Sequence, residues 1–95
     1  MKRIDISLTD KPKPAPYTTY ETVDQQTVII NLNAGVYIAL NETGSFLWER
    51  LDGARTLADI SQELAEFYDV SAMVTDPDVL SLAQELLKEG YIVLA

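Results

Sequence analysis

Hydrophobic and polar residues alternate in the first half of the chain and recur every three to four positions in the second half. Alternation with a period of two is typical of strands with one buried face, whereas a period near 3.6 is typical of amphipathic helices. The period changes within residues 40–53, LNETGSFLWERLDG. The chain is therefore predicted to form a small sheet first and a helical unit after it, which is an α+β fold.

Three segments in the first half are predicted to be strands, at residues 17–23, 27–32 and 36–40. They are rich in aromatic and β-branched residues, which suit a pleated and half-buried surface. The polar turns between them, at residues 24–26 and 33–35, are short enough to force antiparallel neighbours. We expect a three-stranded antiparallel meander whose apolar face is covered by the helices that follow.

The first helix is predicted over about residues 43–51, at the corner where the sheet ends. Asn41 and Thr43 are residue types that accept hydrogen bonds from the free amides of a helix start. Gly53 is the residue type that closes a helix in a left-handed conformation. Trp48 lies on the broad apolar face of this helix and is expected to anchor the core.

The second helix is predicted to start at Thr56, with Asp59 as the partner in a capping box. Acidic and polar residues lie largely on its other face, which is either a solvated surface or a docking surface for a basic enzyme. Its apolar face carries, at helical spacing, Leu57, Ile60, Leu64 and Phe67.

The third helix is predicted to start at Pro77, which fits a first turn, with Thr75 or Asp76 as its cap. Gly90 is expected to end it. Residues 91–94 form an apolar tail that is expected to pack back on the core, as a short strand or otherwise.

Two apolar stripes run along this third helix and together span an arc of roughly 160°. Either the helix is deeply enclosed, or one flank lines a groove that another molecule fills. The first stripe consists of Val79, Leu82 and Leu86, and the second of Leu80, Ala83 and Leu87.

Residues 1–16 are predicted to be an N-terminal arm, and residues 17–95 a single folded domain. Alternating apolar residues suggest a short strand within Met1–Leu8. Within Thr9–Pro16, prolines stand at the alternate positions 12, 14 and 16, which favours extended, solvated backbone that cannot donate sheet hydrogen bonds. This stretch is interpreted as a linker, with a short proline-rich recognition motif as the alternative.

Composition removes most enzymatic functions. The 95 residues contain no cysteine and no histidine, so thiolate zinc sites, cysteine nucleophiles and the commonest general base are missing. The carboxylate pairs Asp52 with Asp59 and Glu85 with Glu89 have no sequence feature that places them in a desolvated pocket. We expect no catalytic residue, no metal and no cofactor.

The net charge of −8 opposes contact with a phosphate backbone, so nucleic acid is not expected as a partner. No apolar run approaches the length of a membrane span, and the start MKRID lacks the apolar region of a signal peptide. The expected location is cytoplasmic, without a membrane partner.

Ordered motifs along most of the chain resemble the PqqD-like family. They are GVYIALNETG at residues 35–44, LW at 47–48, LDG at 51–53, RTLADI at 55–60, YDV at 68–70, DV at 78–79 and Gly90. The resemblance covers about residues 17–94. It implies a winged helix-turn-helix-like domain with a three-stranded antiparallel sheet followed by a three-helix bundle. Pro77 and the proline-rich arm depart from the family pattern.

The resemblance also implies a function. PqqD-like domains are recognition elements for the leader segments of ribosomally made, post-translationally modified peptides (RiPPs). The leader adds as a strand beside the third strand and lies against the third helix. An exposed sheet edge is a suitable site for such strand addition. The residues carried over as the peptide site are Val36, Tyr37, Ile38, Ala39, Leu80, Ala83, Gln84 and Leu87.

The expected partners are a precursor peptide and a modifying enzyme or leader peptidase of the same pathway. A chain of this length resembles the free-standing form of the family, and a peptide chaperone in lasso peptide or other RiPP maturation is the favoured function. A peptide chaperone in PQQ cofactor biosynthesis remains an alternative. A winged-helix DNA-binding protein and a structural subunit without peptide specificity are alternatives of other classes.

Overall fold

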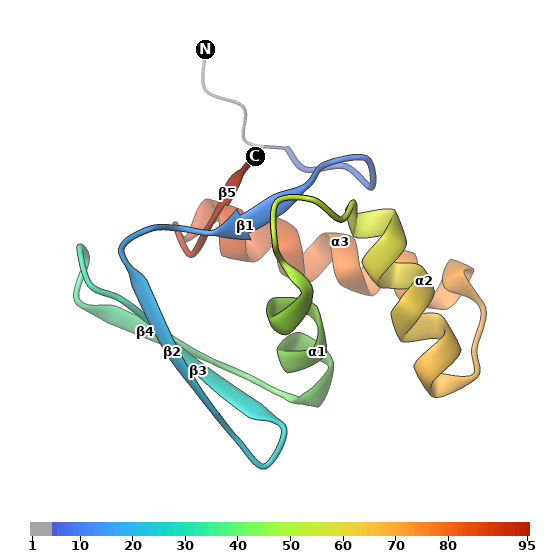
Figure 1. The fold of residues 1–95 in the computed structure, drawn as a ribbon, viewed down its shortest axis with the longest axis horizontal. Coiled ribbons are helices and arrows are strands. Elements are labelled where there is room, and N and C mark those ends of the chain that lie inside the picture. Colours follow the sequence, from blue (N-terminus) through green and yellow to red (C-terminus); the bar gives the residue numbers. More distant parts are fainter. Residues whose placement is uncertain (1–4) are drawn as a thin grey trace.

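The computed structural model describes residues 5–95 and confirms an α+β fold with a three-stranded antiparallel sheet followed by three helices (Figure 1). The sheet lies at one end of the molecule and α2 at the other, with α1 between them. The elements are β1 (Pro12–Pro14), β2 (Thr18–Val23), β3 (Gln26–Asn31), β4 (Val36–Leu40), α1 (Glu42–Arg50), α2 (Leu57–Tyr68), α3 (Ala72–Lys88) and β5 (Ile92–Leu94).

The main sheet has the order β2-β3-β4, and both neighbouring pairs are antiparallel, as predicted. The β2–β3 hairpin turns through Asp24 and Gln25, which both have positive φ (51° and 65°). Positive φ at both central residues is the geometry of a two-residue turn that matches the twist of the strands. In the β3–β4 turn, Gly35 has a φ of 69°, and Asn31 Oδ1 accepts hydrogen bonds from the backbone amides of Asn33 and Ala34.

The covered face of the sheet contains both apolar and hydroxyl side chains. Ile29 is fully buried in the centre, and Thr27 is fully buried beside it. The Thr27 hydroxyl donates to Ser45 Oγ at 2.8 Å and lies 2.8 Å from the Thr22 hydroxyl. Each buried hydroxyl therefore has a partner, and the chain of hydroxyl groups ties β2, β3 and α1 together.

Asn41 caps α1, because its Oδ1 accepts from the Gly44 amide at 3.0 Å. The helix ends at Arg50, with Leu51 as its C-cap. The prediction that Gly53 closes the helix is therefore wrong, although Gly53 does have a positive φ of 75°. Trp48 is buried against the core, as expected, and its ring packs edge-on against Tyr20 with centroids 5.6 Å apart.

The capping box of α2 is confirmed, with both hydrogen bonds between Thr56 and Asp59 present. Leu57, Ile60 and Leu64 are buried as predicted. Phe67 is exposed instead, and its ring contacts other aromatic rings rather than the core.

The prediction that α3 starts at Pro77 is wrong, because the helix starts at Ala72 with Ser71 as its cap. Proline at the sixth helical position costs one backbone hydrogen bond. Side chains of the first turns compensate by fixing α3 to α2. The Ser61 hydroxyl donates to Asp76 Oδ1 at 2.5 Å, and the Thr75 hydroxyl donates to the Ser61 carbonyl at 3.0 Å.

The proline-rich stretch is part of a second, two-stranded sheet, in which β1 pairs antiparallel with β5. Gly90, with a φ of 83°, follows α3 and lets the chain turn back into β5, as expected of the tail. The predicted strand at Met1–Leu8 lies partly outside the described residues, and residues 5–8 form no strand.

The prolines occupy one side of β1. Ala15 N–H donates to the Tyr91 carbonyl and Ala95 N–H donates to the Lys11 carbonyl, so the odd-numbered residues face β5. The even-numbered prolines have no N–H on the opposite side, where the Pro12 carbonyl accepts from Gly53 N–H. Alternating prolines therefore suit a strand paired on one side only. The expectation of a solvated stretch is wrong here, since Ala15 and Pro12 are buried.

The segment of residues 6–15, which we call the N-terminal strap, also covers the start of α2. Its carbonyls at Leu8 and Asp10 accept from the amides of Ala58 and Leu57, at 2.9 and 3.0 Å. These amides belong to the first turn of α2, which has no intrahelical partners for them. None of the helices in the described part of the chain is long and apolar enough to cross a membrane.

Candidate functional site

Strand β4 is an edge strand, because the main sheet ends with it. In an antiparallel pair, alternate residues direct their backbone N–H and C=O groups away from the neighbouring strand. The free side of β4 therefore presents a row of donors and acceptors that another extended chain can pair with.

The register of β4 against β3 gives its side chains two faces. Ile38 lies opposite the buried Ile29, so Val36, Ile38 and Leu40 share the covered face. Leu40 is buried and Ile38 is half-buried at the rim. Tyr37 and Ala39 point to the outer face and are exposed.

A cavity of about 380 Å³ lies between the free side of β4 and one side of α3. The strand contributes residues 38–40, the corner contributes Asn41 and Gly44, and the helix contributes Leu82 and Glu85. A Cβ atom on Gly44 would lie 2.9 Å from Leu40 Cβ and 3.3 Å from Leu82 Cδ2. Gly44 therefore allows the strand, the corner and the helix to approach closely.

The two flanks of α3 differ in what covers them. The open flank consists of Asp78, Leu82 and Glu85, which line cavities beside β4 and the corner. The closed flank consists of Leu80, Gln84 and Leu87, which share one side by helical spacing. The N-terminal strap lies on the closed flank, where Gln84 Oε1 accepts from Ile6 N–H at 2.8 Å.

The residues predicted for the site are therefore divided by the structure. Val36 to Ala39 lie along the free edge. Ala83 is fully buried between the two flanks, while Leu80 and Leu87 are half-buried against the core on the closed flank. The remaining predicted residue, Gln84, contacts the strap.

Leu82 and Glu85 are the residues beside β4 that sequence reasoning missed. The sequence places Leu82 in one stripe with Val79 and Leu86, but the buried stripe is Val79, Ala83 and Leu86, and Leu82 is half-buried. The width of the apolar arc did indicate a second role for the helix, because the buried residues Val79, Ala83 and Leu86 occupy only part of it. Helical periodicity alone could not tell which flank is covered by the chain itself.

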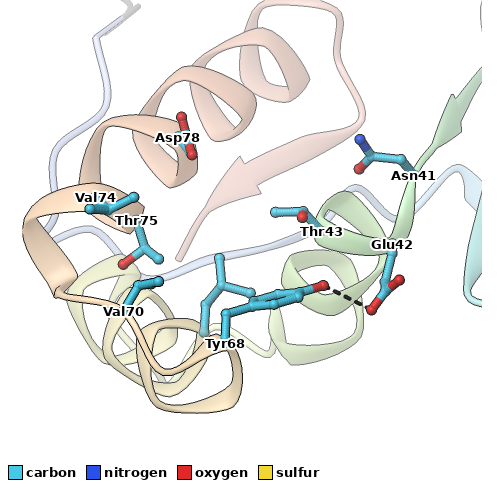
Figure 2. Close-up of a pocket in the computed structure, with 9 residues that line it drawn as sticks. Asn41, Glu42, Thr43, Tyr68, Val70, Val74, Thr75 and Asp78 are labelled. Carbon is cyan, nitrogen blue, oxygen red and sulfur yellow. Dashed lines mark hydrogen bonds between the residues drawn. The ribbon is translucent and has the colours of Figure 1, made fainter.

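Two further cavities extend the groove along the open flank. One, of about 370 Å³, shares Gly44, Leu82 and Glu85 with the cavity at β4. It also shares Asp78 with a larger cavity of about 480 Å³ at the junction of the three helices (Figure 2). Asn41 lines all three cavities, so they form one continuous groove.

The largest cavity contains an aromatic side chain held in place by a hydrogen bond. Tyr68 Oη donates to Glu42 Oε1 at 2.9 Å, as the dashed line in Figure 2 shows. This hydrogen bond to a carboxylate favours the protonated phenol and raises the pKa of Tyr68.

Two of the carboxylates considered for catalysis, Asp52 and Asp59, accept hydrogen bonds from backbone amides. Asp52 accepts from the amides of Ala54 and Arg55, both at 2.9 Å, and these bonds lower the pKa of Asp52. Asp59 belongs to the capping box of α2. Within residues 5–95, no three histidine, cysteine, aspartate or glutamate residues are grouped so that they could hold a metal ion.

The fold and the groove define a winged helix-turn-helix-like α+β domain with an open edge strand beside a helix. A comparison of the sequence with models of protein families places the chain in a family of such domains. The profile of the PqqD family, described as coenzyme PQQ synthesis protein D, matches residues 26–92. The chain therefore belongs to the PqqD family. A comparison with curated protein sequences gave no significant match.

Solved structures of this fold include two complexes with leader peptides. TbiB1 in complex with the TbiA(beta) leader peptide has a TM-score of 0.78 and 20% identity, covering 84% of this chain and 93% of that one. A lasso peptide synthetase B1 complexed with the leader peptide has a TM-score of 0.78 and 24% identity, covering 87% of this chain and 98% of that one.

A third solved structure is the PqqD truncation of Methylobacterium extorquens PqqCD, described as a functional and stand-alone RiPP recognition element. It has a TM-score of 0.79 and 17% identity, and the match covers 95% of this chain and 96% of that one. At these identities, the three similarities show the fold.

Proposed function

We propose that this chain binds the leader segment of a ribosomally made precursor peptide as an added strand on β4. The observation that supports this most directly is the free edge of β4 beside a cavity that Leu82 and Glu85 complete. Membership of the PqqD family and the fold shared with two leader-peptide complexes support the same function.

The two parts of the site have different roles in this proposal. Backbone hydrogen bonds to residues 36–39 supply attraction for any extended peptide, while the cavity supplies selectivity. A leader side chain on the covered face enters the space between Ile38 and Leu82. The peptide site of the sequence analysis is thus revised on its helical side, from the closed flank to the open flank.

The bound leader is presented to a modifying enzyme or leader peptidase, and maturation of a lasso peptide or another RiPP is the favoured pathway. The lasso peptide synthetase B1 structure supports this choice, while the family description supports PQQ biosynthesis as the alternative. With a net charge of −8, the chain should prefer leaders that are not strongly acidic.

A displayed library of random 20-residue peptides, selected against the purified chain, tests the proposal. The most enriched peptide is synthesised and titrated by calorimetry. Leu82→Glu should weaken its binding tenfold or more, because the new carboxylate would be desolvated without a partner. Leu32→Glu is the matched control. The Leu32 side chain is exposed, and its backbone amide donates to the carbonyl of Tyr17, which directly precedes β2.

Hydrogen exchange on the bound peptide complex supplies the second measurement. Amides of β4 should exchange more slowly when the peptide is bound, because they gain partners. If no peptide is enriched, or if binding protects only α2, the proposed strand addition is overturned. Tight binding of duplex DNA that weakens with salt would support the DNA-binding alternative instead.

A further inference from the structure

The largest cavity of the groove combines apolar walls with partial exposure. Leu64 forms a buried floor, and Tyr68, Val70 and Val74 form walls that solvent can reach. Figure 2 shows Tyr68, Val70 and Val74 grouped around one space at the junction of α1, α2 and α3. A small domain gains stability by burying such side chains, so a cluster that stays exposed suggests a binding surface.

Two carboxylates lie at the same cavity, Glu42 from α1 and Asp78 from α3. No lysine or arginine is found among the described residues that line it. An apolar space with only acidic charge at its rim suits an apolar side chain next to a cation. Tyr68 is fixed by its hydrogen bond to Glu42, so the aromatic wall costs little ordering when a ligand binds.

The cavity also lies where a strand added to β4 would lead. Residues 41–43 line it and directly follow the C-terminal end of β4. An added strand that continues the antiparallel order of the sheet has its N-terminal end beside that end of β4. The peptide residues that precede the paired segment are therefore directed along the open flank toward this cavity.

We propose that the cavity between Tyr68, Val74, Glu42 and Asp78 is a second subsite of the groove. Its ligand is an apolar side chain adjacent to a lysine or arginine, in the part of the leader that precedes the segment paired with β4. This inference rests on the proposed function and adds the chemistry and the position of a second recognition element. The groove then recognises two parts of one peptide, the segment paired with β4 and the apolar side chain that precedes it. Recognition of both raises selectivity above that of backbone pairing alone.

A matched pair of variants in the first turn of α3 tests the subsite. Val74→Asp places a carboxylate in the cavity wall, whereas Met73→Asp places the same charge on the neighbouring residue, which does not line the cavity. Both positions are exposed, 57% for Val74 and 84% for Met73, and an acidic residue suits the first turn of a helix. Both variants should therefore fold, which a thermal melt verifies.

The probes are the library-selected 20-residue peptide and a version that lacks the residues before its β4-paired segment. Val74→Asp should weaken binding of the full peptide at least fivefold and leave the shortened peptide unchanged, while Met73→Asp should change neither. The double variant Glu42→Gln with Asp78→Asn should weaken the full peptide about threefold at low salt, with the difference lost at high salt.

Sequences enriched from the library supply an independent readout. They should show an apolar residue next to lysine or arginine before the paired segment, and this preference should disappear when Val74→Asp is the target. If the selected peptide binds at β4 but Val74→Asp behaves like Met73→Asp, the subsite is overturned and the proposed function stands. If no peptide binds at all, both are overturned.

Discussion

The closed flank and the open flank of α3 differ in composition and in surroundings, since the closed flank carries two leucines and the open flank carries one leucine between two carboxylates. Leu80 and Leu87 on the closed flank lie on the side that the N-terminal strap covers, and Gln84 hydrogen-bonds its backbone. Leu82 on the open flank lies beside a cavity at the free edge of β4. The apolar arc of α3 is wider than its buried stripe of Val79, Ala83 and Leu86, and it extends onto both flanks of the helix. On one flank the chain itself lies beside the helix, and on the other flank Leu82 lines a cavity, which is where we propose that a ligand binds.

The largest expected difference between the flanks is in stability. Leu87→Glu should lower the free energy of unfolding by about 3 kcal/mol, because it removes apolar contacts with the core and places a carboxylate on the flank where the strap lies. Leu82→Glu should lower it by only about 1 kcal/mol, because its carboxylate can reach water through the cavity. Urea unfolding of both variants measures the difference, and equal losses would contradict the division into two flanks.

A side chain at Gly44 would disturb the packing of Leu82 on the open flank. Gly44→Val should lower the free energy of unfolding by about 2 kcal/mol, since its side chain would overlap Leu40 and press on Leu82. Gly35→Ala is a useful control. The new Cβ atom would meet no neighbour, so the only cost is that alanine adopts the positive φ less readily than glycine. A Gly44→Val protein as stable as the parent would show that strand and helix can separate at little cost.

Neighbouring residues on the two flanks allow a finer test. Gln84→Ala should lower the free energy of unfolding by about 1 kcal/mol, because the Ile6 amide loses its acceptor. Glu85→Ala, on the open flank, should change it by less than about 0.5 kcal/mol. Thermal melts compare the two. A larger loss for Glu85→Ala would mean that the open flank also stabilises the fold.

The smallest expected effect lies outside both flanks, in the β2–β3 turn. Gln25→Gly should raise the free energy of unfolding by about 0.5 kcal/mol, because glycine adopts the observed positive φ without strain. Peptide binding at β4 should remain unchanged, which calorimetry checks. A change in affinity would show that the hairpin and the groove are coupled.

Local features of the fold were predictable because short-range physical chemistry decides them. The alternation in residues 27–32 and 36–40 follows from one buried face, and the capping box at Thr56 follows from free helix amides. The free edge of β4 was also predictable, because short turns fix the order of the three strands.

The helical side of the site was not predictable in the same way. Periodicity shows how wide an apolar arc is, but the element that covers each part of it comes from elsewhere in the chain. The prolines of β1 illustrate the same point, since their alternation fits a solvated stretch as well as a strand paired on one side. Phe67 fits the apolar face of α2 by spacing, yet it is exposed, and its ring packs against those of Phe46 and Tyr68.

The sequence by itself determined the three strands of the main sheet, the turns between them and the caps that start α1 and α2, because each depends on residues within a few positions of one another. Only the tertiary structure decided that the strap lies on one flank of α3, where it hydrogen-bonds Gln84, while Leu82 on the other flank lies beside the free edge of β4. The physical reason is that burial depends on contacts between segments far apart in the chain, such as Ile6 with Gln84. Such contacts leave no periodic signal in either segment alone.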